Sequence, residues 1–188
     1  MKFDVNTFHP ICILSLKQNK FINNKVSKSI KIPLKITIIN EGSHTRLIQY
    51  LTSQDISIKV LQQNEKKCQK IQRRIRYVWL ETSIYTKMTF ARSLWTIKEK
   101  ELQINNIKRN LPIGQSFIKT KIDTNKNINE LYYFYCKDLE KELRSKKAIW
   151  GRKYQLNYEY NSFILIQEFF SPEIMFFFNN NSNKERKV

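Results

Sequence analysis

The sequence predicts an α+β fold, a single domain in which short helices flank one antiparallel β-sheet. The chain has 188 residues, of which 41% are hydrophobic, enough for one domain with a real core. Several segments alternate apolar with polar side chains, which is the two-residue period of a strand. Strand segments also follow one another across short connections, which antiparallel neighbours allow and parallel neighbours do not.

The first part of the chain leaves two interpretations open. Residues 1–30 hold short apolar pieces interrupted by lysines and asparagines, and we treat them as an N-terminal extension without an assigned role, ahead of a domain at 31–178. Segment 32–39 fits either a strand, because of its isoleucines, or a short helix that begins near Pro33. Local propensity does not choose between the two.

A short helix and a strand follow. Ser43 ends a turn and is a favoured N-cap residue. A helix after it would carry apolar side chains on one side, at Leu47, Ile48 and Leu51. Segment 56–60 alternates apolar and polar residues as a half-buried strand does. We expect the charged segment 66–72 to be a loop.

Two long strands are predicted next, at 73–82 and 88–97. The connection between them is short, so they should form an antiparallel hairpin. In the first of these strands Arg76 shares a face with Val78 and Leu80. It could belong to a surface cluster with the arginines that precede it, but its apolar neighbours favour a binding role.

The second half of the chain alternates between predicted breaks and regular elements. The only Pro-x-Gly, at 112–114, predicts a turn, and 123–129 is polar and loop-like. Apolar residues then recur every four positions, which predicts a helix at 131–143. The Trp-Gly-Arg at 150–152 opens a last hairpin, whose second strand ends near Pro172. The tail at 179–188 is polar and predicted to be disordered.

Glu168 is the most informative single residue, because it interrupts a strand that is apolar on both faces. It shares one face with Ile164 and Ile166, while Leu165 and Phe169 lie on the other. A carboxylate removed from water is costly unless it is paired or protonated, so Glu168 is a candidate functional residue. The alternative is an edge strand on which Glu168 faces solvent.

The net charge of +18 would suit a polyanionic partner such as RNA. The basic residues are nevertheless spread over the whole chain. Ile, Lys and Asn are over-used while there are only 3 glycines and 4 prolines, the bias expected of an A+T-rich organelle genome. We favour this compositional cause and a solvated basic surface, and we do not expect nucleic-acid binding.

The sequence lacks the usual signatures of metal, nucleotide and disulfide chemistry. Its 3 cysteines are far apart and its 2 histidines have no acidic cluster beside them, which argues against a disulfide framework and a metal enzyme. No Gly-rich phosphate loop or nucleophile elbow is present. No apolar stretch reaches the roughly 18 residues needed to span a bilayer. We expect a monomer with no cofactor, no metal and no membrane span.

A series of short elements, in a fixed order, carries a resemblance to a known family. They are Glu41-Gly42-Ser43-His44-Thr45, Arg76, Ala91-Arg92-Ser93, Pro112-Ile113-Gly114, Ile149-Trp150-Gly151-Arg152, and Glu168-Phe169 with Pro172. The series resembles chorismate lyase (chorismate pyruvate-lyase), and more closely the chorismate-lyase-like proteins encoded in red-algal plastid genomes. The resemblance covers roughly residues 40–172 and implies a plastid protein.

The resemblance also implies an activity and a site. It points to a lyase that eliminates pyruvate from chorismate and leaves 4-hydroxybenzoate, without cofactor or metal. It assigns Arg76 to the ring carboxylate, Glu168 to the hydroxyl end, and the backbone amides of His44 and Ile113 to ligand contacts. A guanidinium can hold a carboxylate through two hydrogen bonds. We expect burial to raise the pKa of Glu168, so that it can donate a proton to the departing oxygen.

Several roles stay open at this point. Arg92 either pairs with Glu168 or adds positive potential to the pocket. His44 is either a catalytic base or a loop histidine near the pocket. Gly151 is expected at a backbone position that side chains cannot occupy. Two other functions compete with a lyase, namely a non-catalytic module of the same fold that binds small aromatic carboxylates, and a plastid RNA-binding protein suggested only by charge.

Overall fold

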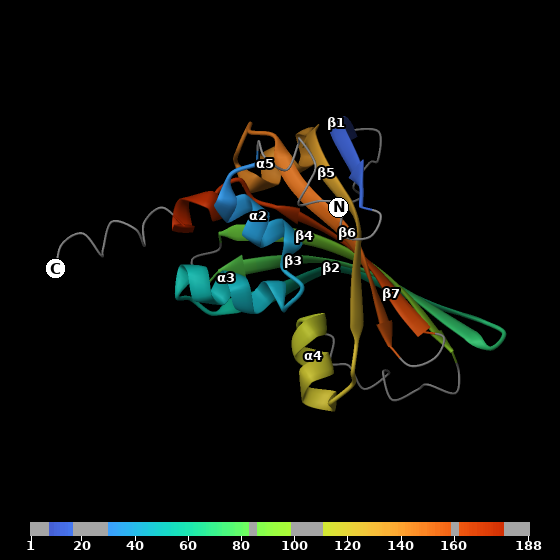
Figure 1. Cartoon of the computed structure of the whole chain (residues 1–188). Coiled ribbons are helices and arrows are strands. Elements are labelled where there is room, and N and C mark those ends of the chain that lie inside the picture. Colours follow the sequence, from blue (N-terminus) through green and yellow to red (C-terminus); the bar gives the residue numbers. More distant parts are fainter. Residues whose placement is uncertain (1–7, 17–29, 83–85, 99–110, 159–161, 179–188) are drawn as a thin grey trace.

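The computed structural model describes residues 8–16, 30–82, 86–98, 111–158 and 162–178 (Figure 1). The elements in chain order are β1 (Phe8–Ser15), α2 (Ile32–Ile39), α3 (His44–Thr52), β2 (Ile56–Cys68), β3 (Ile71–Thr82), β4 (Lys87–Lys98), α4 (Ile113–Thr120), β5 (Asn125–Cys136), α5 (Lys137–Leu143), β6 (Ile149–Tyr158) and β7 (Ser162–Phe170). The predicted tail lies outside the described residues.

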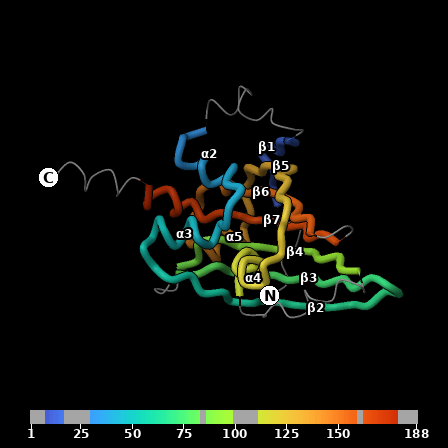
Figure 2. The backbone as a smooth tube through the Cα atoms, turned by 60° about the horizontal axis from the view of Figure 1, so that its bottom comes forward, coloured from blue at the N-terminus to red at the C-terminus, as the bar shows by residue number. Residues whose placement is uncertain are grey.

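The described strands form one antiparallel sheet of seven strands in the order β1-β5-β6-β7-β4-β3-β2. Figure 2 shows β2 at one edge, with β1 and β5 towards the other. The predicted α+β class with an antiparallel sheet is therefore confirmed. Because β7 is the central strand, the alternative in which Glu168 faces solvent from an edge strand is excluded.

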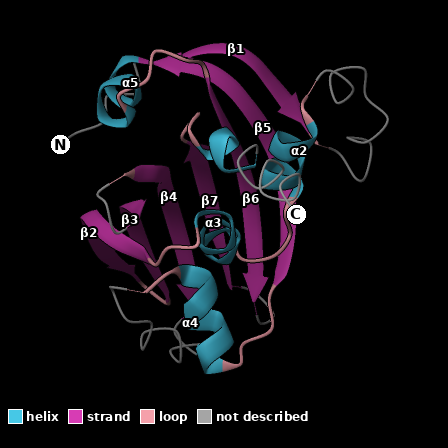
Figure 3. Ribbon diagram, turned by 90° about the vertical axis from the view of Figure 1, so that its left-hand side faces the viewer, coloured by secondary structure: helices cyan, strands magenta, loops and turns pink. Residues whose placement is uncertain are grey.

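The two faces of the sheet are covered differently. Helices α2, α3 and α4 lie across one face (Figure 3), whereas Leu139 and Leu143 of α5 join a cluster on the other face with Trp79 and Phe169. The helix-covered face holds two separate apolar clusters. One includes Ile166 of β7 together with residues of α4, and the other includes Phe170 of β7 together with residues of α2 and α3. Glu168 lies between these two β7 residues, where the apolar core is interrupted.

Several predicted elements are confirmed. Segment 32–39, for which the sequence left strand and helix both open, is a helix with Pro33 in its first turn, where a proline costs no hydrogen bond. The helix after Ser43 is α3, and the Ser43 hydroxyl accepts a hydrogen bond from the amide of Arg46 at 3.4 Å. The two predicted hairpins are present as β3–β4 and β6–β7, and both are antiparallel.

The segment 66–72 was predicted as a loop, and this is wrong. Strand β2 continues to Cys68 and β3 begins at Ile71, so the two strands meet in a tight hairpin. Lys66 and Lys67 are exposed there. Charged side chains at the solvated end of an edge hairpin prevent further strand pairing, and they removed the apolar alternation on which the prediction depended.

The predicted helix at 131–143 is wrong in its first half, and the loop at 123–129 is too long. Strand β5 runs from Asn125 to Cys136, and only Lys137–Leu143 is helical. Aromatic residues dominate 132–135, and they favour strands when neighbouring strands can cover them. The turn predicted at 112–114 is also wrong, because this segment is the start of a helix, with Pro112 as the N-cap of α4.

Gly151 is required by close packing between β6 and β7. A Cβ atom built there would lie 2.6 Å from Cδ1 of Phe169 and 2.7 Å from the carbonyl oxygen of Glu168. The backbone oxygen cannot move aside without disturbing the strand that carries Glu168. The predicted role of Gly151 is therefore confirmed, although the cause is the neighbouring strand and not an unusual backbone angle.

We expect Gly151→Ala to lower the free energy of unfolding by about 1–3 kcal/mol, the range for overpacking a filled core. Chemical denaturation followed by circular dichroism measures this. Gly114→Ala is the matched control, because its Cβ would meet only the Ser43 side chain at 3.4 Å or more, and alanine favours a helix. Equal stability of the Gly151 variant and the wild type would contradict the packing account.

Candidate functional site

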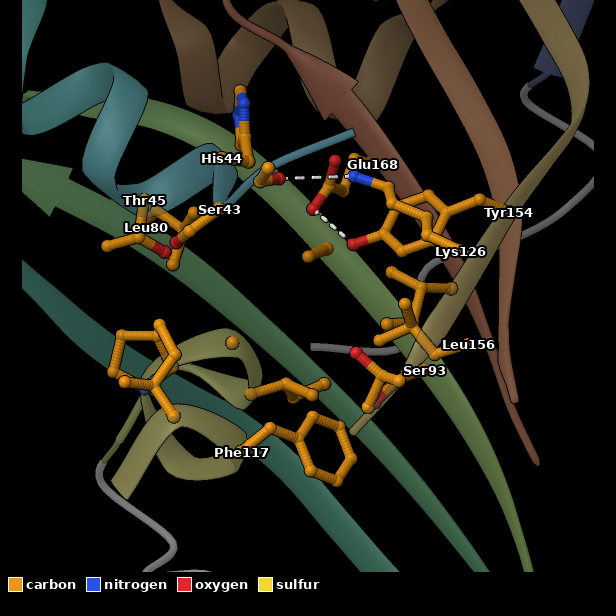
Figure 4. A pocket seen from close by; sticks show the side chains of 18 of the residues that line it. Ser43, His44, Thr45, Leu80, Ser93, Phe117, Lys126, Tyr154, Leu156 and Glu168 are labelled. Carbon is orange, nitrogen blue, oxygen red and sulfur yellow. Dashed lines mark hydrogen bonds between the residues drawn. The ribbon is translucent and has the colours of Figure 1, made fainter. Parts of the chain in front are cut away.

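A cavity of about 410 Å³ opens on the helix-covered face of the sheet. This volume is within the range of small-molecule sites. Much of its wall is apolar, and Leu80, Phe117 and Leu156 are among the side chains that line it (Figure 4). The polar and charged lining residues that are buried or half-buried are Ser43, His44, Thr45, Arg76, Ser93, Lys126, Tyr154 and Glu168.

The register of the sheet places two of these charged groups on the same face. Arg76 of β3 lies opposite Ser93 of β4, and Glu168 of β7 lies opposite Ala91 of β4. Residues directly opposite each other on neighbouring strands point to the same side. Arg76 and Glu168 are therefore separated by one intervening strand and two residues along it, so their backbones lie about 12 Å apart. Their side chains can converge on one small ligand from two ends.

Two helices begin at the cavity. Ser43 and His44 form the start of α3, while Pro112 and Ile113 form the start of α4, and all four residues line the cavity. The first amides of a helix have no partner within it, and the helix dipole is positive at this end. Together these backbone groups favour a negatively charged ligand.

Arg76 is a buried cation at one side of the cavity, with 3% of its surface exposed. Its Nη1 donates a hydrogen bond to the carbonyl oxygen of Leu111 at 3.3 Å, just before α4. Burial, and then the charge of Arg74, lower the pKa of Arg76 to about 10. The guanidinium therefore stays charged at neutral pH, in surroundings where an anion would be favourable.

Glu168 is held by two neighbours on β6. Its Oε2 accepts a hydrogen bond from Nε of Arg152 at 2.8 Å, and its Oε1 accepts one from the Tyr154 hydroxyl at 2.8 Å. Both partners are buried, and Figure 4 shows the bond between Tyr154 and Glu168. A carboxylate has about four acceptor positions, so Glu168 keeps capacity for a ligand hydroxyl.

Arg152 links Glu168 to the helical layer. It is fully buried, and its Nη1 donates to the backbone carbonyl oxygens of Thr37, Ile38 and Asn40 at 3.1, 3.0 and 2.8 Å. These carbonyls belong to the last turn of α2 and its cap, which have no partners inside the helix. A cation at a helix C-terminus is also favoured by the dipole. Arg152 therefore fixes where α2 ends and where the segment leading into α3 begins.

The protonation state of Glu168 differs from the one expected. Burial by itself raises the pKa of Glu168, but the charge of Arg152, those of His44 and Lys126, and the Tyr154 hydrogen bond lower it to about 2. The predicted increase in pKa is wrong, because it considered burial without the partner on β6. Glu168 is ionised at neutral pH and can accept a hydrogen bond or a proton, whereas donation is not available to it.

His44 lies at the cavity through its backbone, while its ring is directed away. Nε2 is 2.9 Å from Oγ1 of Thr89, and the ring packs on Phe170 with centroids 4.9 Å apart. Nδ1 has no hydrogen-bond partner among the described residues. Burial is the main cause that lowers the pKa of His44 to about 4, so the ring is neutral at neutral pH. This geometry favours the backbone-amide role over that of a catalytic base.

Arg92 does not join the cavity. It lies opposite Gln167 and not Glu168, so it projects from the other face, where it is exposed. The pairing with Glu168 that was considered for Arg92 is made by Arg152. The hairpin could have revealed this, because Tyr158 pairs with Ser162 and the same register brings Arg152 opposite Glu168.

The sequence did not identify Tyr154 and Lys126 as site residues, since a tyrosine in an apolar strand and a lysine in a polar segment give no distinct signal.

The family model described as "Chorismate pyruvate-lyase Rv2949c-like" matches residues 38–178, which include the whole cavity wall. The chain belongs to this family. The resemblance identified from the sequence is therefore confirmed at the level of the family.

Curated relatives match along most of the chain. "Uncharacterized protein ycf21" of Antithamnion sp. is 35% identical over 170 residues, which cover 90% of this chain and 93% of the relative. The protein of the same name from Porphyra purpurea is 32% identical over 161 residues, with coverage of 81% and 90%. These ycf21 relatives of red algae are plastid-encoded.

Two further observations concern the described part of the chain. It contains no group of three or more His, Cys, Asp or Glu side chains arranged to hold a metal ion. None of its helices has the length and apolar character needed to cross a membrane.

The buried ion pair predicts a large effect of Arg152→Met on stability. The variant leaves the Glu168 carboxylate buried without its cation, and breaking such a pair costs about 3–5 kcal/mol. Denaturant unfolding at neutral pH measures the change. Arg92→Met removes the same charge from an exposed position on β4, and we expect a change within about 0.5 kcal/mol.

The double variant Arg152→Met/Glu168→Leu tests whether the unpaired Glu168 carboxylate causes the loss of stability. It leaves no buried charge, so it should recover a substantial part of the stability that the single variant loses. A double variant that is no more stable than Arg152→Met would show that the lost contacts with α2, and not the unpaired carboxylate, dominate.

Proposed function

We propose that this protein is a plastid chorismate pyruvate-lyase, which eliminates pyruvate from chorismate and leaves 4-hydroxybenzoate. Membership of the family supports the class of reaction. The observation that carries the proposal is a charged guanidinium, Arg76, and an ionised carboxylate, Glu168, on one sheet face and in one cavity. A ligand with a carboxylate at one end of a ring and a hydroxyl at the other would contact both.

The Arg76 end would bind the ring carboxylate. A guanidinium forms two parallel hydrogen bonds with a carboxylate, and the amides at the starts of α3 and α4 add donors at the same cavity. The apolar wall between the two ends would contact the ring. Holding the ring at both ends positions its reacting carbons, which is where much of the rate enhancement of a single-substrate elimination comes from.

The reaction itself needs one proton removed and one bond broken. In chorismate, C4 carries the hydroxyl and a hydrogen, and C3 carries the enol ether of pyruvate. The C4 proton leaves, its electron pair forms the new ring double bond, and the C3–O pair departs with the enolpyruvate oxygen. The ring becomes aromatic as 4-hydroxybenzoate, and the departing enolate of pyruvate takes up one proton at its methylene carbon and becomes pyruvate.

Glu168 would act at the C4 end of the ring. Its carboxylate would accept a hydrogen bond from the 4-hydroxyl, and in that position it would also be near enough to the same carbon to receive the C4 proton. Its low pKa makes it a weak base, and the gain from aromatisation compensates for this weakness. Tyr154 and Arg152 hold both oxygens, so the carboxylate does not have to reorient during the reaction.

A binding module without catalysis is the second candidate, since the same cavity would hold a small aromatic carboxylate. The ionised Glu168 favours the enzyme. Glu168 is only 5% exposed, so its negative charge is buried. A site that only binds the carboxylate of a ligand gains nothing from this charge, whereas an elimination needs a proton acceptor.

Purified protein incubated with chorismate should release pyruvate and 4-hydroxybenzoate in equal amounts, faster than the spontaneous reaction. Coupled detection of pyruvate, with mass identification of the aromatic product, measures both. Folded protein that binds 4-hydroxybenzoate without releasing pyruvate would contradict the lyase proposal and support the binding module. Folded protein that neither binds 4-hydroxybenzoate nor releases pyruvate would remove both proposals.

Two variants should separate binding from chemistry. Arg76→Ala should weaken 4-hydroxybenzoate binding by about 2–3 kcal/mol, the scale for losing a charged hydrogen bond, while the variant Arg73→Ala, at an exposed position of the same strand, should bind normally.

Glu168→Gln should lower kcat more than it lowers product affinity, because the amide keeps the shape but cannot accept a proton. Calorimetry and steady-state kinetics measure these effects. Unchanged turnover in Glu168→Gln would make Glu168 a structural residue only.

A further inference from the structure

Lys126 is a second cation at the cavity, and neither the family's motif series nor the reaction described above uses it. It lies on β5 and is half-buried. Its Nζ donates to the carbonyl oxygens of Asn40 and Gly42 at 2.9 and 3.3 Å, and it lies 4.3 Å from the centre of the Tyr154 ring. An ammonium group has three donors, so these two hydrogen bonds leave one N–H for a ligand.

The position of Lys126 is at the Glu168 end of the cavity. Tyr154, whose ring the ammonium faces, donates to Glu168, and Figure 4 shows the Lys126 and Glu168 side chains next to each other at the cavity. Arg76 comes from β3, on the other side of the central strands. The two cations therefore lie at opposite ends of the space that a ligand would fill.

The electrostatic state of Lys126 agrees with this position. Burial, and then the charge of Arg152, lower the pKa of Lys126 to about 8, while Glu168 and Glu41 act in the opposite direction. The ammonium is still mainly protonated at neutral pH. Burial and the charge of Arg152 both disfavour the charged form of Lys126. A carboxylate bound beside the ammonium would stabilise that charged form.

The geometry of the substrate then assigns a ligand group to this cation. In chorismate the enol ether is attached to C3, next to the carbon that carries the hydroxyl and away from the ring carboxylate. If the ring carboxylate binds Arg76, both the hydroxyl and the enolpyruvyl group lie at the Glu168 end. The second carboxylate of the substrate therefore arrives where Lys126 lies.

We propose that Lys126 binds the enolpyruvyl carboxylate and makes the site selective for a dicarboxylate over the monocarboxylate product. This inference rests on the proposed function, because it takes its ligand geometry from chorismate. An ammonium at that place also stabilises the negative charge that develops on the departing enolpyruvate. Once pyruvate has left, 4-hydroxybenzoate has no group for Lys126, so substrate is favoured over product.

The test compares two stable ligands that need no turnover. The first is 4-hydroxybenzoate, and the second is 3-(carboxymethoxy)-4-hydroxybenzoate, which adds a carboxylate on an ether at the position of the enolpyruvyl group. Titration calorimetry gives the dissociation constant of each. We expect wild type to prefer the dicarboxylate. In Lys126→Met this preference should fall about 10- to 100-fold, the scale for a charged hydrogen bond, while 4-hydroxybenzoate binds within about twofold of wild type.

Two further variants complete the design. Lys126→Arg keeps the cation and should retain much of the preference. Lys119→Met removes one positive charge from the exposed outer surface of α4 and should change neither dissociation constant, which controls for the net charge of +18. With chorismate as substrate, Lys126→Met should raise KM by a similar factor.

The outcomes are distinguishable. If Lys126→Met weakens both ligands equally, Lys126 only anchors the segment of Asn40 and Gly42, and the inference is overturned. It is also overturned if neither ligand is affected. If wild type does not turn over chorismate but shows a preference for the dicarboxylate that depends on Lys126, the inference stands while the lyase proposal fails.

Discussion

The buried contact between Arg152 and Glu168 is the constraint on which the rest of the site depends. Glu168 is in the central strand of the sheet, where an unpaired carboxylate would be strongly unfavourable. Arg152 neutralises it from the adjacent strand through Nε and uses a second nitrogen, Nη1, to bind the carbonyls at the end of α2. One side chain therefore joins the sheet to the helical layer, at the point where the chain turns towards α3 and the cavity.

The cavity exists because the helix-covered core is divided into two. One apolar cluster lies under α4 and the other under α2 and α3. Between them the inward-facing positions carry charged or polar groups, among them Arg76, Ser93 and Glu168. Since these residues are on paired strands, the distances between their Cα atoms are determined by backbone hydrogen bonds. Such placement on rigid elements suits a site that must hold a ligand at two ends.

Charge in this protein acts locally at the cavity. The large positive net charge is spread over the chain and agrees with a compositional origin, whereas the buried Glu168 is paired specifically with Arg152. Arg152 holds Glu168 in its ionised form, and burial keeps His44 neutral. The site at neutral pH therefore combines a proton acceptor with two cations, Arg76 and Lys126. That combination suits an elimination from an anionic substrate better than it suits donation of a proton to a leaving group.

The sequence by itself determined the strands of the sheet's centre, the faces of Arg76 and Glu168, and the family, because strand period and short motifs are local properties. It did not determine the choice between strand and helix at 131–136, which depends on the strands that cover the aromatic side chains of β5. The register of the β6–β7 hairpin places Arg152 opposite Glu168, but only the tertiary structure showed that the two side chains pair and that Glu168 is ionised. The contact of Arg152 with Thr37 joins residues 115 positions apart, and a pKa depends on charges gathered by such long-range contacts, which no local pattern records.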